Sequence, residues 1–404
     1  MNINRELIEK FYGGLDERSQ EALDAAAERV VAAKKRGGKV AVVTGSGPNL
    51  HEGVTTLIAE LIEKGIVDGV TTSSAVVNHE MGGALDRVKM CGAAQFGLDE
   101  DKMPRGNVFE FTDMSDGELA ELAKEMILDD ELLAKRHSAE GHMVIKAAAN
   151  MAYPMGLRTE RLAEEIHSLC RQSGLPFETV AGWGCDRRTM LGSGAAKNVP
   201  VLVTIPQLVG GGHVGLAVGD SIPIAERSRR IAAMLGSADV IIESAVALTQ
   251  EIHDGPFETY TGHGIWSWWQ GQSVYSLKDK SLIRFDLDEN LRRAQDLQKS
   301  SAMIQEAIDK GLPKTKISKI PFRMEMSAFA RHEGSLPVIG DIGMIWPVFA
   351  TKIADALGIE LEFMSYKQET EEGRAMREWI VENVRPLDRA EMLKKYREWQ
   401  AQNR

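Results

Sequence analysis

Residues 39–49 read KVAVVTGSGPN and residues 69–75 read GVTTSSA, with a helical pattern between them. Each segment begins with a short run of apolar, mostly β-branched residues and ends in small or hydroxylated ones, as a strand followed by a loop does. Strand, helix and strand in this order predict a βαβ unit, in which the loops over the carboxyl ends of the strands hold a ligand. The chain therefore predicts a nucleotide-like binding site near its N-terminus.

The composition is that of an ordinary globular protein. Of its 404 residues, 43% are hydrophobic and 26% are charged, and the formal net charge is −11. Because no basic excess exists to neutralise phosphates, we expect neither a nucleic-acid partner nor an acidic membrane surface. The three cysteines, Cys91, Cys170 and Cys185, are widely spaced and odd in number, which favours a reducing compartment. With no signal-peptide pattern and no run of about 18 apolar residues, we expect a cytoplasmic protein.

Strands alternate with helices along the chain, which predicts an α/β fold with a Rossmann-like parallel sheet and helices on both faces. Strands are expected at 39–43, 69–72, 107–111, 199–205 and 239–243. Helices are expected at 15–37, 54–64, 115–135, 137–175, 185–197, 224–236, 288–310, from 347 and after 370, and turns at 340–343. We expect residues 1–310 to form the Rossmann-like domain. Residues 311–404 are expected to form a C-terminal α/β extension, which either completes that domain or stands as a separate lobe.

The loops after the first two strands form the candidate cofactor site. Glycines let backbone amides approach an anion at the start of a helix, and two adjacent hydroxyl-rich loops are more than a turn requires. A tight strand-to-helix turn is the alternative for the first loop, which is neither a Walker A nor a G-x-G-x-x-G motif. The candidate residues are Thr44, Gly45, Ser46, Gly47, Asn49, Thr71, Thr72, Ser73 and Ser74.

Three consecutive glycines, Gly210–Gly212, follow the most apolar predicted strand and precede His213. Glycines carry an entropic cost, so this run suggests the close approach of a ligand or of a neighbouring chain. His213 is therefore a candidate catalytic acid or base. A structural, hydrogen-bonded histidine is the alternative.

Residues 253–269 combine two histidines, two acids and three tryptophans. Histidine transfers protons near neutral pH, carboxylates hold an ammonium group, and tryptophan faces attract cations. Such a segment suits a cationic amine substrate. The candidates are His253 and His263 for catalysis, and Asp254, Glu258 and Trp268 for substrate binding. A metal site is the alternative for the histidines and acids, without support from H-E-x-x-H or C-x-x-C spacing, and an oligomer interface is the alternative for the tryptophans.

The span 59–85, AELIEKGIVDGVTTSSAVVNHEMGGAL, resembles the deoxyhypusine synthase family. The matching elements are Gly65-Ile66-Val67-Asp68, Thr71-Thr72, Ser73-Ser74-Ala75 and His79-Glu80, and residues 44–49, 97–100, 106–108 and 197–201 resemble further family motifs. The resemblance implies a Rossmann-like sheet, a homotetramer with sites at a dimer interface, and bound nicotinamide dinucleotide (NAD), with His79 and Glu80 at the cofactor. Members of the family oxidise spermidine and transfer its aminobutyl group to a lysine or another amine.

The chain departs from this family at the catalytic lysine. The family has that lysine in a Ser-Trp-Gly-Lys context, whereas the nearest match here is Ser267-Trp268-Trp269-Gln270. Glutamine forms no imine, so authentic deoxyhypusine synthesis is not expected. The family's aspartate after the strand that ends at Pro206 is replaced by Val209-Gly210, and its Gly-Gly-Gly block has no counterpart within residues 224–239.

Three functions fit these observations. The first is a divergent enzyme that binds NAD and either oxidises a small cationic amine, such as a polyamine, or transfers its aminoalkyl group. The second is a non-redox hydrolase or lyase that uses the histidine and carboxylate cluster, with or without a divalent metal. The third is a non-catalytic binding protein. We expect a small-molecule substrate and a homo-oligomer, namely a tetramer.

Overall fold

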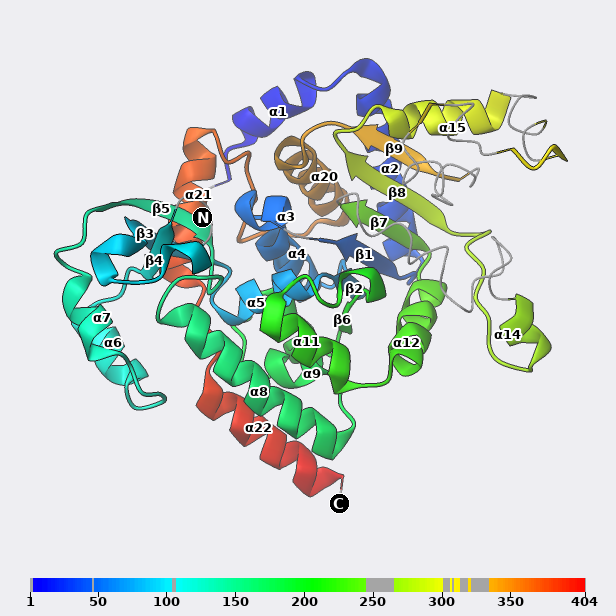
Figure 1. Cartoon of the computed structure of the whole chain (residues 1–404). Helices are drawn as coiled ribbons and strands as arrows, with labels where there is room; N and C mark the ends of the chain where they lie inside the picture. The colour runs from blue at the N-terminus through cyan, green and yellow to red at the C-terminus, as the bar shows by residue number, and fades with distance from the viewer. Residues whose placement is uncertain are drawn as a thin grey trace.

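The computed structural model describes residues 3–45, 47–103, 107–244, 265–300, 306, 309–312, 319–320 and 334–403. Its centre is a six-stranded parallel sheet in the spatial order β6-β2-β1-β7-β8-β9 (Figure 1). The strands are β1 (Val40–Thr44), β2 (Gly69–Thr72), β6 (Val201–Val203), β7 (Val240–Ser244), β8 (Ser281–Asp286) and β9 (Leu336–Ile339). The predicted α/β fold with a parallel sheet is confirmed.

The strand order makes this a doubly wound sheet. The chain builds outward from β1 through β2 to β6, then returns to the other side of β1 and builds through β7, β8 and β9. Counted along the chain, these six strands lie in the order 3-2-1-4-5-6, which is the order of dinucleotide-binding Rossmann folds. The winding reverses between β1 and β7. We call the carboxyl ends of these two strands the switch point.

Helices cover both faces of this sheet. One face packs on α2 (Glu17–Lys35), α4 (Val54–Glu63) and α20 (Ile342–Leu357), and the other on α12 (Ile224–Ser237) and α15 (Asn290–Ser300). Neighbouring residues of β1 divide between the two faces, with Val42 in the first hydrophobic cluster and Val43 in the second. Burial on both faces explains why this strand is a continuous apolar run without polar alternation.

A smaller antiparallel sheet has the order β4-β3-β5, with β3 (Leu85–Gly92), β4 (Val108–Thr112) and β5 (Gly141–Ala147). The helix predicted over 137–175 is wrong in its first part, because residues 141–147 pair with β3 along their whole length. The helix predicted over 115–135 is divided into α6 (Asp116–Leu122) and α7 (Asp130–Lys135). The side chain of Asp129 accepts the N–H of Leu132 and so starts the second helix.

The C-terminal part of the chain contributes to the main sheet, since β9 pairs with β8. Helix α20 begins at Ile342, before the predicted start at Pro347, because the Asp341 side chain accepts the N–H of Gly343 at 2.9 Å. The other helices are α1 (Arg5–Gly13), α3 (Gly47–His51), α5 (Ser74–Met81), α8 (Met155–Ser173), α9 (Phe177–Gly182), α10 (Met190–Lys197), α11 (Gly212–Ser221), α14 (Ile265–Trp269), α21 (Glu371–Asn383) and α22 (Arg389–Gln402). No helix within the described residues is both long and apolar enough to cross a membrane.

Candidate functional site

Asn49 joins the two strands of the switch point. Its Nδ2 donates to the carbonyl oxygen of Gly45, directly after β1, at 2.8 Å and to that of Ser244, the last residue of β7, at 3.2 Å. Its Oδ1 accepts a hydrogen bond from Ser244 Oγ at 2.7 Å. Asn49 is completely buried. Asn49 therefore holds the loop after β1 in place between the carboxyl ends of β1 and β7.

Two buried threonine hydroxyls lie beside each other at the same edge of the sheet. Thr44 ends β1 and Thr72 ends β2, one residue beyond the paired residues Val43 and Thr71, so both side chains point to the same face. Both residues are at most 1% exposed, and in the described part of the chain neither Oγ1 has a hydrogen-bond partner. A buried polar group without a partner costs about 1–3 kcal/mol. Two buried hydroxyls without a partner among the described residues therefore lie at this edge of the sheet.

The serines of the second loop make hydrogen bonds within the protein. Ser73 Oγ accepts the N–H of Val76 at 3.2 Å and so caps α5. Ser74 Oγ donates to the carbonyl oxygen of Gln207 at 2.8 Å and accepts the N–H of Gly211 at 2.9 Å. A Cβ on Gly211 would lie 2.6 Å from the carbonyl oxygen of Ser74. Close packing of two backbone segments thus accounts for a glycine at this position.

His213 lies in the first turn of α11 and is exposed. Its Nε2 is 3.5 Å from Glu164 Oε1 on α8. This surface position does not test the predicted acid/base role of His213, which stays a prediction.

His79 and Glu80, predicted near the cofactor, are both buried on α5. Glu80 accepts the N–H of Met190 with Oε1 and that of Leu191 with Oε2, each at 2.9 Å, at the start of α10. Burial raises the pKa of Glu80 to about 7 against the effect of these two hydrogen bonds. Within the described residues, both oxygens of this carboxylate are therefore used to hold α10.

A group of basic side chains, His51, His79, Lys146 and Arg377, lies between the main sheet's helices and the small sheet; we call it the basic cluster. It combines α3 and α5, which follow β1 and β2, with β5 and with α21, which runs beside β5 in Figure 1. Arg377 Nη2 lies 3.4 Å from His51 Nδ1 and donates to the carbonyl oxygen of Ile145. Lys146 Nζ is 2.8 Å from both oxygens of Glu110.

The two histidines of the basic cluster are neutral at physiological pH. Burial, followed by the charge of Arg377, lowers the pKa of His51 to about 4. Burial also lowers the pKa of His79. His79 Nδ1 is 2.8 Å from the carbonyl oxygen of Ala148, which only accepts, so Nδ1 carries the proton and Nε2 is left as a proton acceptor. His51 Nδ1 faces the donor Arg377, so its Nε2 carries the proton.

The basic cluster is close to the switch point along the chain. His51 is the last residue of the five-residue helix α3, and Gly47 is the first. Because an α-helix rises only about 1.5 Å per residue, His51 lies a short distance along the helix axis from the loop after β1. The sequence analysis missed His51, Lys146 and Arg377. His51 follows the first loop directly, which is a usable signal. Lys146 falls within the helix predicted over 137–175 and Arg377 within the helix predicted after 370. The sequence around these two residues therefore gives no sign of a site.

Several predicted site residues lie outside the described part of the chain: Ser46, His253, Asp254, Glu258 and His263. Trp268 is described, on α14, and is 61% exposed. Figure 1 shows α14 well apart from α3 and α5. The structure therefore does not bring Trp268 to the switch point. Among the described residues, no group of three or more His, Cys, Asp or Glu side chains is arranged to hold a metal ion.

No family model and no curated protein matches this chain. Solved structures match it weakly. A variant of AgrE crystallised with L-arginine has a TM-score of 0.41 and 12% identity, and AgrE with ornithine and NAD+ has a TM-score of 0.41 and 11% identity. Each comparison covers 85% of this chain and 34% of AgrE, so the chain spans about a third of AgrE's length.

A conserved putative LOR/SDH protein from Methanococcus maripaludis S2 is similar over 89% of this chain and 70% of its own, with a TM-score of 0.38 and 10% identity. These identities and TM-scores are too low to transfer a ligand or a reaction to this chain.

Proposed function

We propose that this chain binds a nicotinamide dinucleotide at the switch point and acts on a small cationic amine. The observation that carries the proposal is the strand order 3-2-1-4-5-6, with Gly45 and the start of α3 at Gly47 following β1 at the point where the winding reverses. Ligands of open α/β sheets bind at that point, outside the carboxyl ends of the strands. The deoxyhypusine synthase resemblance points to the same cofactor and stays a prediction, as does the tetramer.

The residues at this edge fit a dinucleotide. Thr44 and Thr72 present buried hydroxyls that have no protein partner in the described part of the chain. At Gly47 a Cβ would have no heavy atom of the described residues within 4 Å, so those residues leave room for a ligand beside the backbone there. Thr44, Gly45, Gly47 and Thr72 would hold the phosphates and ribose, on a loop that Asn49 fixes. When bound, the nicotinamide ring supplies a hydride acceptor.

The basic cluster supplies the groups for the substrate. We propose that His79 Nε2 accepts a proton from the substrate's ammonium group, since Nδ1 is occupied with Ala148. Arg377 holds an anionic group on the same molecule, because a purely cationic amine would meet its like charge, whereas Lys146 is already paired with Glu110. The substrate is therefore a small amine that also carries a carboxylate, as an amino acid does. The predicted roles of His213, His253, His263, Asp254 and Glu258 stay predictions.

The cofactor half is tested by calorimetric titration of the wild type with NAD+ and NADH, beside the double variant Thr44→Val/Thr72→Val. Valine keeps the shape and removes the hydroxyls. We expect saturable binding by the wild type and at least about tenfold weaker binding by the variant, the equivalent of one hydrogen bond of about 1.4 kcal/mol. Stability of the unliganded variant should be equal or higher, since an unpaired hydroxyl is removed from each site.

Thr112→Val is the matched control, because the Thr112 hydroxyl is likewise buried and unpartnered among the described residues but lies on β4. It should leave dinucleotide binding unchanged. A wild type that binds neither NAD+ nor NADH would overturn the cofactor assignment, and equal binding by the double variant would remove the two threonines from the site.

The catalytic half is tested with His79→Asn. Asparagine keeps a donor toward the Ala148 carbonyl and removes the acceptor at Nε2. We expect loss of at least about a hundredfold in turnover, the usual scale for a general base, with dinucleotide affinity retained. The measurement is NADH formation with ornithine, arginine and spermidine as substrates. Activity equal to the wild type would show that His79 is not the base.

A further inference from the structure

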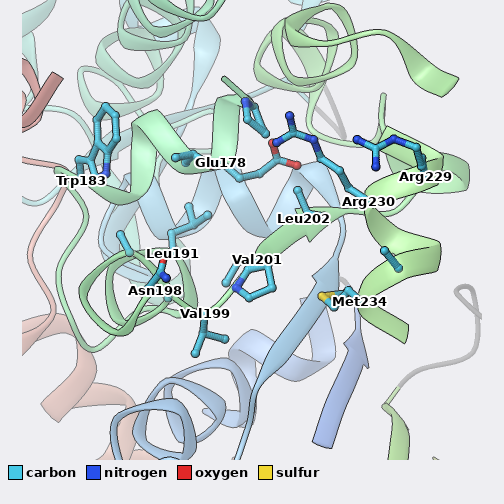
Figure 2. Close-up of a pocket in the computed structure, with 16 residues that line it drawn as sticks. Glu178, Trp183, Leu191, Asn198, Val199, Val201, Leu202, Arg229, Arg230 and Met234 are labelled. Atoms are coloured by element: carbon cyan, nitrogen blue, oxygen red, sulfur yellow. The ribbon is translucent and has the colours of Figure 1, made fainter. Parts of the chain in front are cut away.

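A cavity of about 530 Å³ lies beside β6, the edge strand of the main sheet (Figure 2). It is bounded by α9, α10 and α12 and by the residues that lead into β6. Its volume falls in the range of small-molecule sites, about 300–1,000 Å³. On this strand the lining runs from Asn198 to Leu202, whereas the switch point lies at the carboxyl ends of β1 and β7. The cavity is thus separate from the proposed dinucleotide site.

The walls of the cavity are mainly apolar. Val201 and Leu202 come from the strand, Leu191 from α10 and Met234 from α12. Figure 2 shows Trp183 and Leu191 on one side, with Arg229 and Arg230 reaching in from the opposite side. A ligand that fills this space has an apolar body.

The cavity does not offer a free strand edge for a second polypeptide at Val203. The N–H of Val203 donates to Glu178 Oε1 at 2.6 Å, and its carbonyl oxygen accepts from Arg227 Nη1 at 3.2 Å. Glu178 and Arg227 also form an ion pair, and both side chains are completely buried. With these backbone groups occupied, an added strand would have to displace a buried ion pair, which disfavours a strand-like partner.

The charge at the cavity is positive. Its charged lining residues are Glu178, which Arg227 neutralises, and Arg229 and Arg230. The two arginines share one carboxylate, Glu226. Arg230 uses only Nε for this contact, at 2.7 Å, and its two Nη groups have no partner within the described residues. In a chain of net charge −11, two unused guanidinium donors beside an apolar cavity suit a carboxylate, which binds them in a planar, two-bond arrangement.

We infer that this cavity binds a small amphipathic carboxylate, whose apolar body packs on Leu202 and Met234 and whose carboxylate is held by the Nη groups of Arg230. The inference is independent of the proposed function, because none of the switch-point residues lines the cavity.

Calorimetric titration of the full chain with decanoate and with decanol tests the inference. Decanoate should bind saturably at one site, and decanol should bind at least tenfold more weakly. Arg230→Gln should weaken decanoate about tenfold and leave decanol unchanged. Ala233→Trp, which fills the cavity from α12, should abolish binding of both. Ala195→Leu fills it from α10 and serves if the tryptophan variant does not fold.

Arg18→Gln is the matched control, since Arg18 makes an equivalent two-bond pair with Asp296 elsewhere on the surface. It should bind decanoate as the wild type does. Equal decanoate binding by Arg230→Gln or by both cavity-filling variants would overturn the inference. So would a wild-type dimer in sedimentation that either filling variant dissociates, because a second copy of the chain would then occupy the cavity.

Discussion

Two glutamates of this molecule are equally buried and differently held. Glu80, on α5, accepts two backbone N–H groups, each at 2.9 Å. Glu243, on β7, has no hydrogen bond to either oxygen in the described part of the chain, and Arg284 Nη1 lies 3.5 Å from its Oε2. Burial raises the pKa of both carboxyl groups to about 7.

The difference shows that burial and contacts carry separate information. Burial alone sets the direction of the pKa, since it disfavours the charged form in both places. The contacts distinguish the roles. Glu80 ties α5 to the start of α10 and is part of the framework. Glu243 lies one residue before the end of β7, beside the switch point, and its carboxyl group is held there by the charge of Arg284 without a hydrogen bond from the described residues.

A third buried glutamate gives the strongest test of this contrast. Glu178 is held by Arg227 and by the N–H of Val203. Arg227→Met leaves that carboxylate buried and unpaired, so we expect a loss of about 3–5 kcal/mol in the free energy of unfolding. Urea unfolding measures it. The double variant Glu178→Gln/Arg227→Met should recover part of the loss, and a loss below about 1 kcal/mol in the single variant would contradict the pairing.

Glu80→Ala should have the next largest effect. It leaves the N–H groups of Met190 and Leu191 without an acceptor, at a cost of about 2–4 kcal/mol. Glu243→Gln, which removes no hydrogen bond that the described residues make, should change stability by less than about 1 kcal/mol at a pH well below 4.5, where Glu243 is protonated in both the folded and the unfolded chain. Thermal unfolding of the two variants side by side measures the difference. Equal losses would mean that Glu243 is held as firmly as Glu80.

The last prediction concerns how the free energy of unfolding depends on pH. Above the ordinary value of 4.5, the unfolded chain releases the Glu243 proton while the folded chain retains it until about pH 7. Folded protein then binds more protons, so this group's stabilisation is full below pH 4.5 and is lost as the pH rises through 7. Glu243→Gln should reduce the slope of stability against pH in this window by up to about 1.4 kcal/mol per pH unit. An unchanged slope would show that the group titrates normally.

Much of the fold was predictable because the main sheet is buried on both faces. Short runs of apolar and β-branched residues mark β1, β2 and β7, and their predicted positions agree with the structure to within a residue or two. The small sheet was not predictable in this way. β3 and β5 are only half buried and carry charged residues such as Lys89 and Lys146, so their local sequences lack a strong strand pattern and depend on each other for pairing. β8 is almost completely buried, but Arg284 in its middle interrupts the apolar run that would otherwise predict the strand.

The candidate site was predictable only in part. The loops after β1 and β2 do meet at one edge, as their parallel arrangement requires. The sequence did not distinguish residues that face a ligand from those that support the loops. Ser73, Ser74 and Asn49 make internal hydrogen bonds, whereas Thr44 and Thr72 have none among the described residues. That division depends on three-dimensional neighbours and not on residue type.

Asn49 also has a mechanical consequence. The two halves of the main sheet, β6-β2-β1 and β7-β8-β9, meet along the β1–β7 ladder. Asn49 adds three hydrogen bonds at one end of that ladder, and so ties the ends of β1 and β7 together at the carboxyl edge. The opposite end of the ladder is also tied, since Asp239 Oδ2 accepts the N–H of Lys39 at 2.9 Å. The two halves are therefore expected to open together, with slow amide exchange at both ends of the ladder, and the edge proposed to bind the cofactor keeps its geometry.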